Sequence, residues 1–418
     1  MSSSRRTQIG PERAPWLRDG PLPRLLDVLD RDGEEARVVG GAVRNALLGE
    51  PVNEVDVATT AVPDEVIRRA EAAGLKPVPT GVEHGTVTVV INGTPFEVTT
   101  LREDVETYGR HARVAFGRNW QRDAERRDFT MNALYASRDG TVHDYVGGLD
   151  DLKERRVRFI GEPARRIAED YLRILRFFRF HAAYGEGGHP DAAGLSACIA
   201  AREGLETLSR ERVRAELFKL LVAPHVVPAL VSMSEGGLLV VVLGGVPLLA
   251  SFANMTKLER ELALAHDPIR RLGALAASTT EDAERLRERL RLANTENDRL
   301  ASMADRWWQI STATDMRAGR VLIYRLGPER FLDRALLAWS RAWPEGVADN
   351  HWRDLVLLLS RWSAPEFPLK AADFIARGVA KGPPLGAALR AAEEAWIAQD
   401  FPMDAAALTK IAEAAQRA

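Results

Sequence analysis

Two acidic residues, Glu54 and Asp56, stand two positions apart in the segment VNEVDVATT. Residues two apart in a β-strand lie on the same face, so this spacing predicts a pair of carboxylates, with Val55 and Val57 facing a core. Two carboxylates on one face repel each other unless a cation lies between them, and Mg²⁺ is the common choice. The segment therefore predicts a magnesium site.

A glycine pair, Gly40 and Gly41, follows the short apolar run Val38-Val39 and precedes a helical pattern over residues 42–48. Glycine lets the backbone approach a bulky anion, and the first turn of the helix presents free N–H groups to phosphate. A phosphate-binding turn beside paired carboxylates is the minimal equipment for phosphoryl or nucleotidyl transfer.

The elements that must position these residues are predicted from periodicity. Two strand-like runs over 85–91 and 95–100 flank Asn92-Gly93, which is a strong hairpin signal. Glu97 on the second run is expected to face the same side as Glu54 and Asp56. It is either a third catalytic carboxylate or an ordinary exposed strand residue.

Four motifs follow one another between Gly40 and Arg176, over about a third of the chain: GGAVRN, EVDVAT, RRDFTMNA and EDYLRILR. Together they resemble the class II tRNA nucleotidyltransferase and bacterial poly(A) polymerase family. The sequence departs from the family at Glu54, where the family usually has aspartate. The resemblance implies an α+β fold, in which a polymerase-β-like nucleotidyltransferase palm of mixed sheet and helices precedes an all-helical neck, body and tail.

The composition of the N-terminus and the same resemblance together predict four segments. Residues 1–23 are expected to be a flexible leader, residues 24–158 the nucleotidyltransferase head, and residues 159–228 a helical neck that carries a nucleotide-selecting helix. Residues 229–418 are expected to form a helical body and tail that bind tRNA.

Site residues are carried over motif by motif. Glu54 and Asp56 are expected to bind two Mg²⁺ ions, with Glu97 as a further catalytic carboxylate. In RRDFTMNA, Arg127 is expected to meet phosphate, Asp128 to accept a hydrogen bond from a ribose hydroxyl, and Asn132 to support the same pocket. The nucleotide-binding residues implied are Gly40, Gly41, Arg44, Arg127, Asp128, Asn132, Glu169, Asp170, Arg173 and Arg176.

One long amphipathic helix is predicted over residues 164–185, and Glu169, Asp170 and Arg173 cluster on one of its faces. The alternative without a function is that this cluster is an ordinary ion pair on the protein surface. The family places this triplet under the incoming base. Cytosine and adenine both present an amine beside an unprotonated ring nitrogen, so Asp170 would accept from the amine while Arg173 donates to the ring. Uracil and guanine reverse that order and would be rejected, and Glu169 is expected to orient Arg173.

The composition sets further limits. The 418 residues include 57 basic and 59 acidic side chains, so an RNA-binding surface must come from local clusters of arginine. A single cysteine, Cys198, excludes an internal disulfide and a cysteine zinc site, and the N-terminus lacks a secretory pattern. A cytoplasmic protein is therefore expected.

Three segments remain open to interpretation. The uncharged run 236–255 is long enough to span a membrane, but glycines and Pro247 interrupt it, so we expect a buried bend between helices and no membrane partner. Residues 102–127 are expected to be an arginine-rich loop, either simply solvated or a mobile basic segment near the triphosphate and the RNA end. Seven of the nine tryptophans lie beyond residue 300, where they either form core or stack on RNA.

The main hypothesis is a Mg²⁺-dependent nucleotidyltransferase that adds C, C and A to the 3′ end of tRNA from CTP and ATP. The partners expected are the tRNA 3′ end, its acceptor arm and elbow, and the two nucleotides. Poly(A) polymerase or partial CCA addition shares the same motifs and is the nearest alternative. A tRNA-binding protein that has lost catalysis is an alternative of another class.

Overall fold

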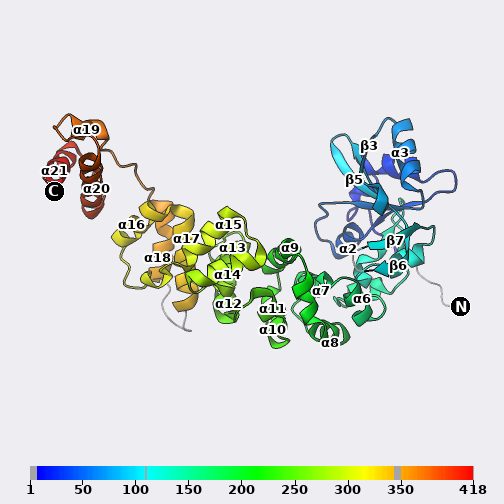
Figure 1. Ribbon diagram of the computed structural model, residues 1–418. Coiled ribbons are helices and arrows are strands. Elements are labelled where there is room, and N and C mark those ends of the chain that lie inside the picture. Colours follow the sequence, from blue (N-terminus) through cyan, green and yellow to red (C-terminus); the bar gives the residue numbers. More distant parts are fainter. Residues whose placement is uncertain (1–6, 109–110, 343–349, 418) are drawn as a thin grey trace. The chain divides into compact units, whose positions relative to one another are not determined.

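The computed structural model describes residues 7–108, 111–342 and 350–417 (Figure 1). For residues 103–108 and 111–114 the description is limited to the backbone. The chain divides into two compact units, one formed by residues 1–247 with 289–291 and the other by residues 248–288 and 292–418. All the strands belong to the first unit, and the α+β fold class is confirmed for the described residues.

A mixed seven-stranded sheet forms the head, with strand order β3-β4-β5-β2-β1-β8-β9. The central pair β2 and β5 is parallel, and the other neighbours are antiparallel. The strands of this sheet are β1 (Ala36–Val39), β2 (Asp56–Thr59), β3 (Lys76–Gly81), β4 (Thr86–Ile91), β5 (Thr94–Thr100), β8 (Leu134–Ala136) and β9 (Val142–Asp144). The predicted hairpin at Asn92-Gly93 is confirmed, because Ile91 pairs with Thr94 and both turn residues have positive φ.

Short helices connect and cover these strands. They are η1 (Pro15–Leu17), α1 (Leu22–Leu29), α2 (Gly41–Leu48), α3 (Pro63–Ala72), η2 (Val82–His84), α4 (Trp120–Glu125), η3 (Thr130–Asn132) and α5 (Gly148–Lys153). α2 ends at Gly49, which has φ of 75°, a left-handed conformation that glycine adopts without strain. A cluster around Tyr135 and Trp120, whose rings meet edge to face at 5.2 Å, forms part of the core.

The expectation of a flexible leader is wrong from residue 7 onward. Gln8 forms an isolated bridge with Thr141, and the Ile9 N–H donates to the Gly140 carbonyl at 2.9 Å. Ile9, together with Ala14 and Leu17, is buried. Apolar side chains spaced among the polar residues therefore pack this segment against the head, and residues 1–6 lie outside the described part of the chain.

The expectation of a loop over residues 102–127 is also wrong. This segment forms a two-stranded hairpin of β6 (Arg102–Tyr108) and β7 (His111–Phe116), followed by α4. The Asn119 side chain accepts from the N–H groups of Gln121 and Arg122 and so begins that helix. Arg110 and the side chains of His111 and Arg113, which the loop hypothesis invoked, lie outside the described residues.

The rest of the first unit is helical in the part that the structure describes. Its helices are α6 (Pro163–Glu169), α7 (Leu172–Tyr184), α8 (Ala192–Ala200), η4 (Arg202–Thr207), α9 (Arg210–Leu221), α10 (Val226–Glu235) and α11 (Leu238–Leu243). The single helix predicted over 164–185 is therefore two helices. Asp170 leaves the helical conformation, with φ of −158° and ψ of 107°, and its side chain accepts from the Leu172 N–H at the start of α7.

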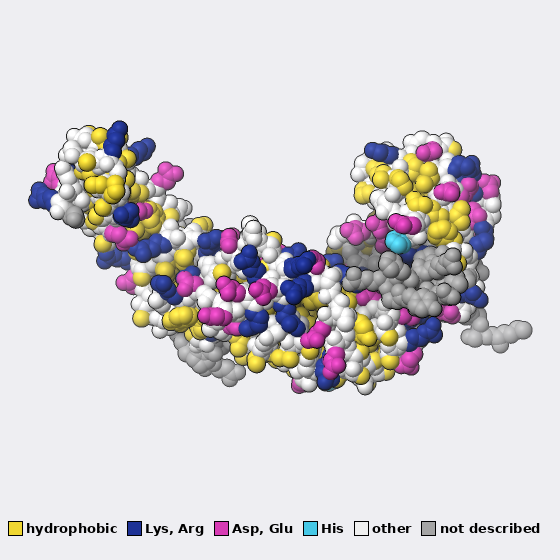
Figure 2. Space-filling model, viewed as in Figure 1, with side chains coloured by type: hydrophobic (Ala, Val, Ile, Leu, Met, Phe, Trp, Pro, Cys, Tyr) yellow, Lys and Arg dark blue, Asp and Glu magenta, His cyan; other side chains and the backbone are white. Residues whose placement is uncertain are grey.

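The second unit contains only helices among its described residues. They are α12 (Leu249–Glu261), α13 (Pro268–Ala276), α14 (Thr280–Leu290), α15 (Asn294–Ala304), η5 (Trp307–Gln309), α16 (Met316–Leu326), α17 (Pro328–Ala342), α18 (Asn350–Arg361), α19 (Ala371–Ile375), α20 (Pro383–Ala398) and α21 (Ala405–Gln416). Figure 2 shows basic and acidic side chains interspersed on the visible face of these helices.

The tryptophans of this unit serve mainly as core. Trp339, Trp352 and Trp396 are buried in two apolar clusters, and the rings of Trp339 and Trp352 stack at 6.2 Å. Trp308 is 58 % exposed, and Trp343 lies outside the described residues. The uncharged run 236–255 spans α11 and the first part of α12, with the predicted bend between them. The expectation that this bend is buried is wrong, since Val246 is 78% exposed. Within the described residues, none of the helices combines the length and the apolar composition needed to cross a membrane.

Candidate active site

A cavity of about 620 Å³ in the first unit is lined by residues of the sheet, of α2 and of α7. It brings together all the predicted site residues except Glu97 and Glu169. Residues as distant in sequence as Gly40 and Arg176 therefore share one cavity, which is the arrangement that the four motifs predict.

The paired acids lie where the segment enters the sheet. Asp56 is the first residue of β2, and Glu54 precedes that strand. Val57 is fully buried, whereas Val55 is only half-buried, so the expected core face begins at Val57, two residues later than predicted. Both carboxylates line the cavity.

Glu97 is next to Asp56 across the sheet. Val57 pairs with Val98 in the parallel ladder between β2 and β5, which places the preceding residues of the two strands side by side. The pKa of the Asp56 carboxyl is raised, mainly by desolvation and next by the negative charge of Glu97. The charge of Glu54 raises this pKa further, whereas the charge of Arg127 lowers it. Three carboxylates therefore contribute negative charge at one point of the sheet.

This donor set fits a hard divalent cation. Mg²⁺ usually binds through one or two carboxylates and completes its octahedron with water and substrate phosphate oxygens. The described residues contain no group of three or more His, Cys, Asp or Glu side chains that could hold a metal ion. Glu54 and Asp56 both line the cavity, and their carboxylate chemistry fits such a cation.

The glycine turn has the conformation that its composition predicts. Gly40 has φ of 74° and ψ of −125°, a region that other residues rarely adopt. Its N–H donates to the Leu134 carbonyl at 3.1 Å, which fixes the turn against β8. Because α2 begins at Gly41, the first turn of that helix adjoins the cavity.

Arg127 is held in place by two residues that the sequence did not identify. The Asp123 carboxylate, 1 % exposed, accepts from the Tyr135 hydroxyl at 2.7 Å and from Arg127 Nη2 at 3.3 Å. Burial alone would raise the pKa of Asp123, but the charges of Arg127 and Arg126 outweigh burial and lower it. Arg127 is therefore fixed beside an ionised carboxylate, with its Nη1 atom near Gly40.

Each oxygen of the Asp128 carboxylate already accepts two hydrogen bonds. Its Oδ1 accepts from the Phe129 N–H and from Asn132 Nδ2, and its Oδ2 accepts from Arg176 Nε and Nη2. Since a carboxylate oxygen offers about two acceptor sites, a ribose hydroxyl would have to replace one of these donors. The proposed ribose contact of Asp128 remains a prediction, and its observed role is to join the motif to α7.

Arg44 makes a second junction with α7. It is buried, and its Nη1 donates to Asn132 Oδ1 at 2.5 Å. Its Nη2 donates to the Tyr184 hydroxyl at 2.7 Å, and its guanidinium lies 4.1 Å from the Tyr184 ring centroid. Burial lowers the pKa of Arg44. The helix after the glycine turn is therefore coupled to the end of α7.

The selecting triplet is arranged differently from the prediction in one respect. Glu169 and Arg173 do form the expected contact, with Oε2 and Nη1 2.5 Å apart. Asp170 meets Arg173 through the backbone, where the Asp170 carbonyl accepts from the Arg173 N–H at 3.0 Å, and its side-chain Oδ2 accepts from Arg212 Nη2 at 2.6 Å. The break between α6 and α7 turns Asp170 away from the helical face on which the sequence placed it, although Asp170 and Arg173 both line the cavity.

Several cavity residues were not predicted. Arg179 and Phe180 follow Arg176 by one helical turn on α7, and this i, i+3 and i, i+4 spacing was a usable signal. Arg126 was identified only as part of a basic segment. Arg212 comes from α9, a segment that resembles the last neck motif of the family and predicts packing and support on the phosphate side. Its contact with Asp170, 42 residues earlier in the chain, follows from no local pattern.

Comparison with known proteins supports the same assignment. A family model described as the poly A polymerase head domain matches residues 36–158, and one described as a probable RNA and SrmB-binding site of polymerase A matches residues 191–252. Human CCA tRNA nucleotidyltransferase 1, mitochondrial, is 33% identical over 386 residues, which cover 92% of this chain and 87% of the relative. The CCA-adding enzyme of Geobacillus thermodenitrificans is 42% identical over 51% of this chain and 52% of its own length.

Among solved structures, the Bacillus stearothermophilus CCA-adding enzyme in complex with CTP superimposes with a TM-score of 0.75 at 27% identity. The match covers 94% of this chain and 96% of that one. With similarity extending over nearly the whole of both chains, and with the four motifs gathered at one cavity, the protein belongs to the family of class II CCA-adding enzymes, the CCA tRNA nucleotidyltransferases.

Proposed function

We propose that this protein adds C, C and A to the 3′ end of tRNA, using CTP and ATP and no nucleic-acid template. The observation that carries the proposal is the single cavity that combines Glu54 and Asp56, the glycine turn and the pair Asp170 and Arg173. A phosphate-binding turn, carboxylates for a cation and a base-reading pair are the parts that nucleotidyl transfer with base selection requires.

Base selection is assigned to Asp170 and Arg173. The carboxylate accepts from the exocyclic amine of cytosine or adenine, and the guanidinium donates to the adjacent ring nitrogen. Glu169 and the Arg166 carbonyl both contact Nη1 of Arg173, at 2.5 and 2.7 Å. These contacts fix the plane of the guanidinium while other N–H groups face the base.

Two Mg²⁺ ions are the proposed cofactor, with Glu54 and Asp56 as their protein ligands and Glu97 as a neighbouring charge. Bound Mg²⁺ supplies charge stabilisation for the attacking 3′-hydroxyl oxygen and for the pyrophosphate leaving group. Arg127, held by Asp123 and Tyr135, is positioned to bind the triphosphate.

The tRNA partner is assigned to the helical part of the chain, with the neck over residues 159–228 and the body and tail over 229–418. The match of residues 191–252 to a family model described as a probable RNA-binding site supports RNA binding by this part of the chain, and that match extends across the proposed boundary at residue 228. We also propose a cytoplasmic location, which agrees with a sequence that contains a single, buried cysteine.

Poly(A) polymerase activity and partial CCA addition use the same catalytic motifs. The relatives that match over most of the chain are named CCA tRNA nucleotidyltransferase or CCA-adding enzyme, which favours complete CCA addition. Loss of catalysis is disfavoured because the intact cavity retains both carboxylates and the arginines around them.

One experiment separates these functions. Purified protein is incubated with Mg²⁺, tRNA that lacks CCA, and each labelled nucleotide alone or in combination. Incorporation of two C residues followed by one A is expected. Long runs of A would indicate poly(A) synthesis, addition of C or A alone would indicate partial activity, and no incorporation would contradict the assignment of an enzyme.

A further inference from the structure

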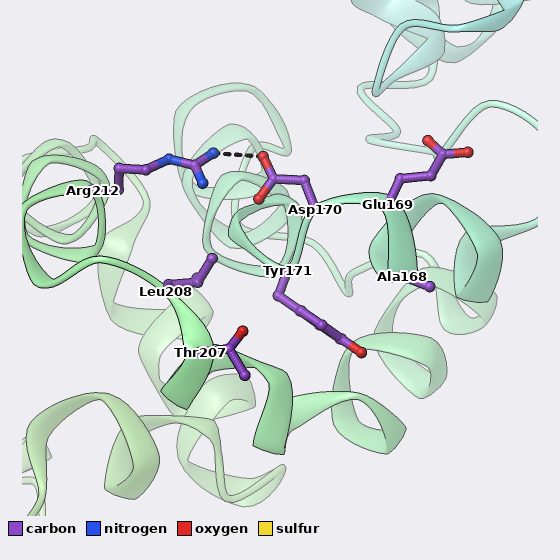
Figure 3. Close-up of a pocket in the computed structure, with 7 residues that line it drawn as sticks. All are labelled: Ala168, Glu169, Asp170, Tyr171, Thr207, Leu208 and Arg212. Carbon is purple, nitrogen blue, oxygen red and sulfur yellow. Dashed lines mark hydrogen bonds and ion pairs between the residues drawn. The ribbon is translucent and has the colours of Figure 1, made fainter. Parts of the chain in front are cut away.

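Asp170 stands between two cavities. One is the nucleotide cavity, and the other has a volume of about 550 Å³ and is lined by residues of α6, η4 and α9 together with Asp170 (Figure 3). Asp170 and Arg212 are the two residues that line both. The Asp170 carboxylate thus has open space on either side, and its orientation must be fixed by specific contacts.

Two hydrogen bonds fix that orientation. Oδ1 accepts from the Leu172 N–H at 3.1 Å, and Oδ2 accepts from Arg212 Nη2 at 2.6 Å. Figure 3 shows the Asp170 and Arg212 side chains pointing toward each other, whereas the Glu169 carboxylate points away from this pair. Each oxygen keeps a further acceptor site, so the carboxylate is oriented and still able to accept from the amine of a base.

The helix that carries Arg212 is itself firmly anchored. Val213 and Leu217 of α9 are buried, and Glu216, one turn after Arg212, accepts from Arg179 Nε of α7 at 2.6 Å. Arg212 therefore extends from a fixed backbone toward Asp170.

We propose that Arg212 is a positioning residue for nucleotide selection, which orients the Asp170 carboxylate toward the incoming base and keeps it out of the adjoining cavity. This inference rests on the proposed function, because it concerns how that same site rejects UTP and GTP. Without Arg212, only the Leu172 N–H restrains the carboxylate, and Asp170 can rotate into the adjoining cavity.

The stability of the fold is expected to depend little on this ion pair. The side chains of Arg212 and Asp170 are 37% and 34% exposed, and ion pairs at that exposure contribute little to folding. A substitution at Arg212 should therefore change selectivity without unfolding the protein, which separates positioning from a structural role.

The test compares Arg212→Met with Arg212→Lys on tRNA that lacks CCA, measuring kcat and KM for CTP and UTP. Arg212→Met is expected to lower the ratio of kcat/KM for CTP over UTP by about tenfold, mainly through a higher KM for CTP, since one charge-assisted hydrogen bond is lost. Arg212→Lys should recover part of the ratio. The Tm of both variants should stay within about 2 °C of wild type.

Arg291→Met is the matched control. It removes an arginine–carboxylate pair to the same helix, 2.5 Å from Glu211, at an exposed position outside both cavities. Its selectivity should equal that of wild type. A wild-type ratio in Arg212→Met, or an equal loss in Arg291→Met, would overturn the inference while the proposed function stands. A wild-type protein that adds neither C nor A would overturn the proposed function, and the inference with it.

Discussion

Asp128 accepts two hydrogen bonds from the guanidinium of Arg176, at 2.8 Å from Nε and 2.5 Å from Nη2. The carboxylate belongs to the motif RRDFTMNA of the head, and the arginine belongs to α7. This pair therefore joins the part of the cavity assigned to phosphate with the part assigned to the base.

Replacing Asp128 by Asn should weaken the fold in a pH-dependent way. Burial would raise the pKa of Asp128, but Arg176 outweighs it and the pKa lies below the ordinary value of 3.8. A lowered folded-state pKa means that the charged carboxylate stabilises the folded state above the ordinary pKa, and that this contribution is lost as pH falls through the folded-state value. Measured by denaturant unfolding near neutral pH, the free energy of unfolding of Asp128→Asn should be lower than that of wild type by about 2 kcal/mol. This difference between variant and wild type should become smaller below about pH 4. A difference in unfolding free energy between wild type and Asp128→Asn that does not change with pH would contradict this account.

Asp56→Ala should abolish nucleotide incorporation, because the carboxylate at the start of β2 is assigned to the metal. Binding of tRNA, measured by filter retention, should stay near wild type. Asp64→Ala, at an exposed position in the first turn of α3, is the control and should keep full activity. Residual activity of Asp56→Ala above a few per cent would exclude the metal assignment.

Glu54 replaces the aspartate that is usual in this family. Two substitutions test separately the length of its side chain and its negative charge. Glu54→Asp should retain activity within about tenfold, because the carboxylate remains at the cavity. Glu54→Gln should lose at least about a hundredfold in kcat, since the neutral amide no longer balances a cation. Equal activity of Glu54→Gln and wild type would show that this side chain binds no metal.

Tyr184→Phe should loosen the contact between α2 and α7. The change removes the hydroxyl that accepts from Arg44 Nη2 at 2.7 Å and leaves the aromatic ring in place. The KM for CTP should rise at least about tenfold, which corresponds to the lower end of the free energy of a hydrogen bond to a charged group. Tyr145→Phe removes a similar bond from Arg37 Nη1, at 2.8 Å, outside the nucleotide cavity and should leave KM unchanged. Equal KM values for Tyr184→Phe and wild type would contradict the coupling.

The sequence predicted the parts of this site that depend on local chemistry. The glycine turn, the acid pair and the contact of Glu169 with Arg173 each involve residues at most four apart, where backbone geometry alone sets the neighbours. The Asn92-Gly93 hairpin was equally local.

Non-local and competing local interactions account for what the sequence did not predict. The sequence predicted that Glu97 faces the same side as Asp56 and left its role open, because its place directly beside Asp56 depends on the parallel pairing of β2 with β5, which no turn connects. The helix break at Asp170 arose because its side chain accepts a backbone N–H, an option that a continuous apolar period conceals. The arginine-rich segment was read as a loop on composition, although its backbone pairs as β6 and β7.

The most direct measurement of the central claim is nucleotide choice by an Arg173 variant. Arg173→Ala removes the guanidinium that is assigned to the ring nitrogen of C and A, and single-turnover addition to tRNA lacking CCA is followed with each of the four nucleotides. The account predicts that the variant incorporates UTP and GTP at rates that approach those of CTP and ATP. An Arg173 variant that adds C and A and still strictly rejects UTP and GTP would contradict selection by these side chains.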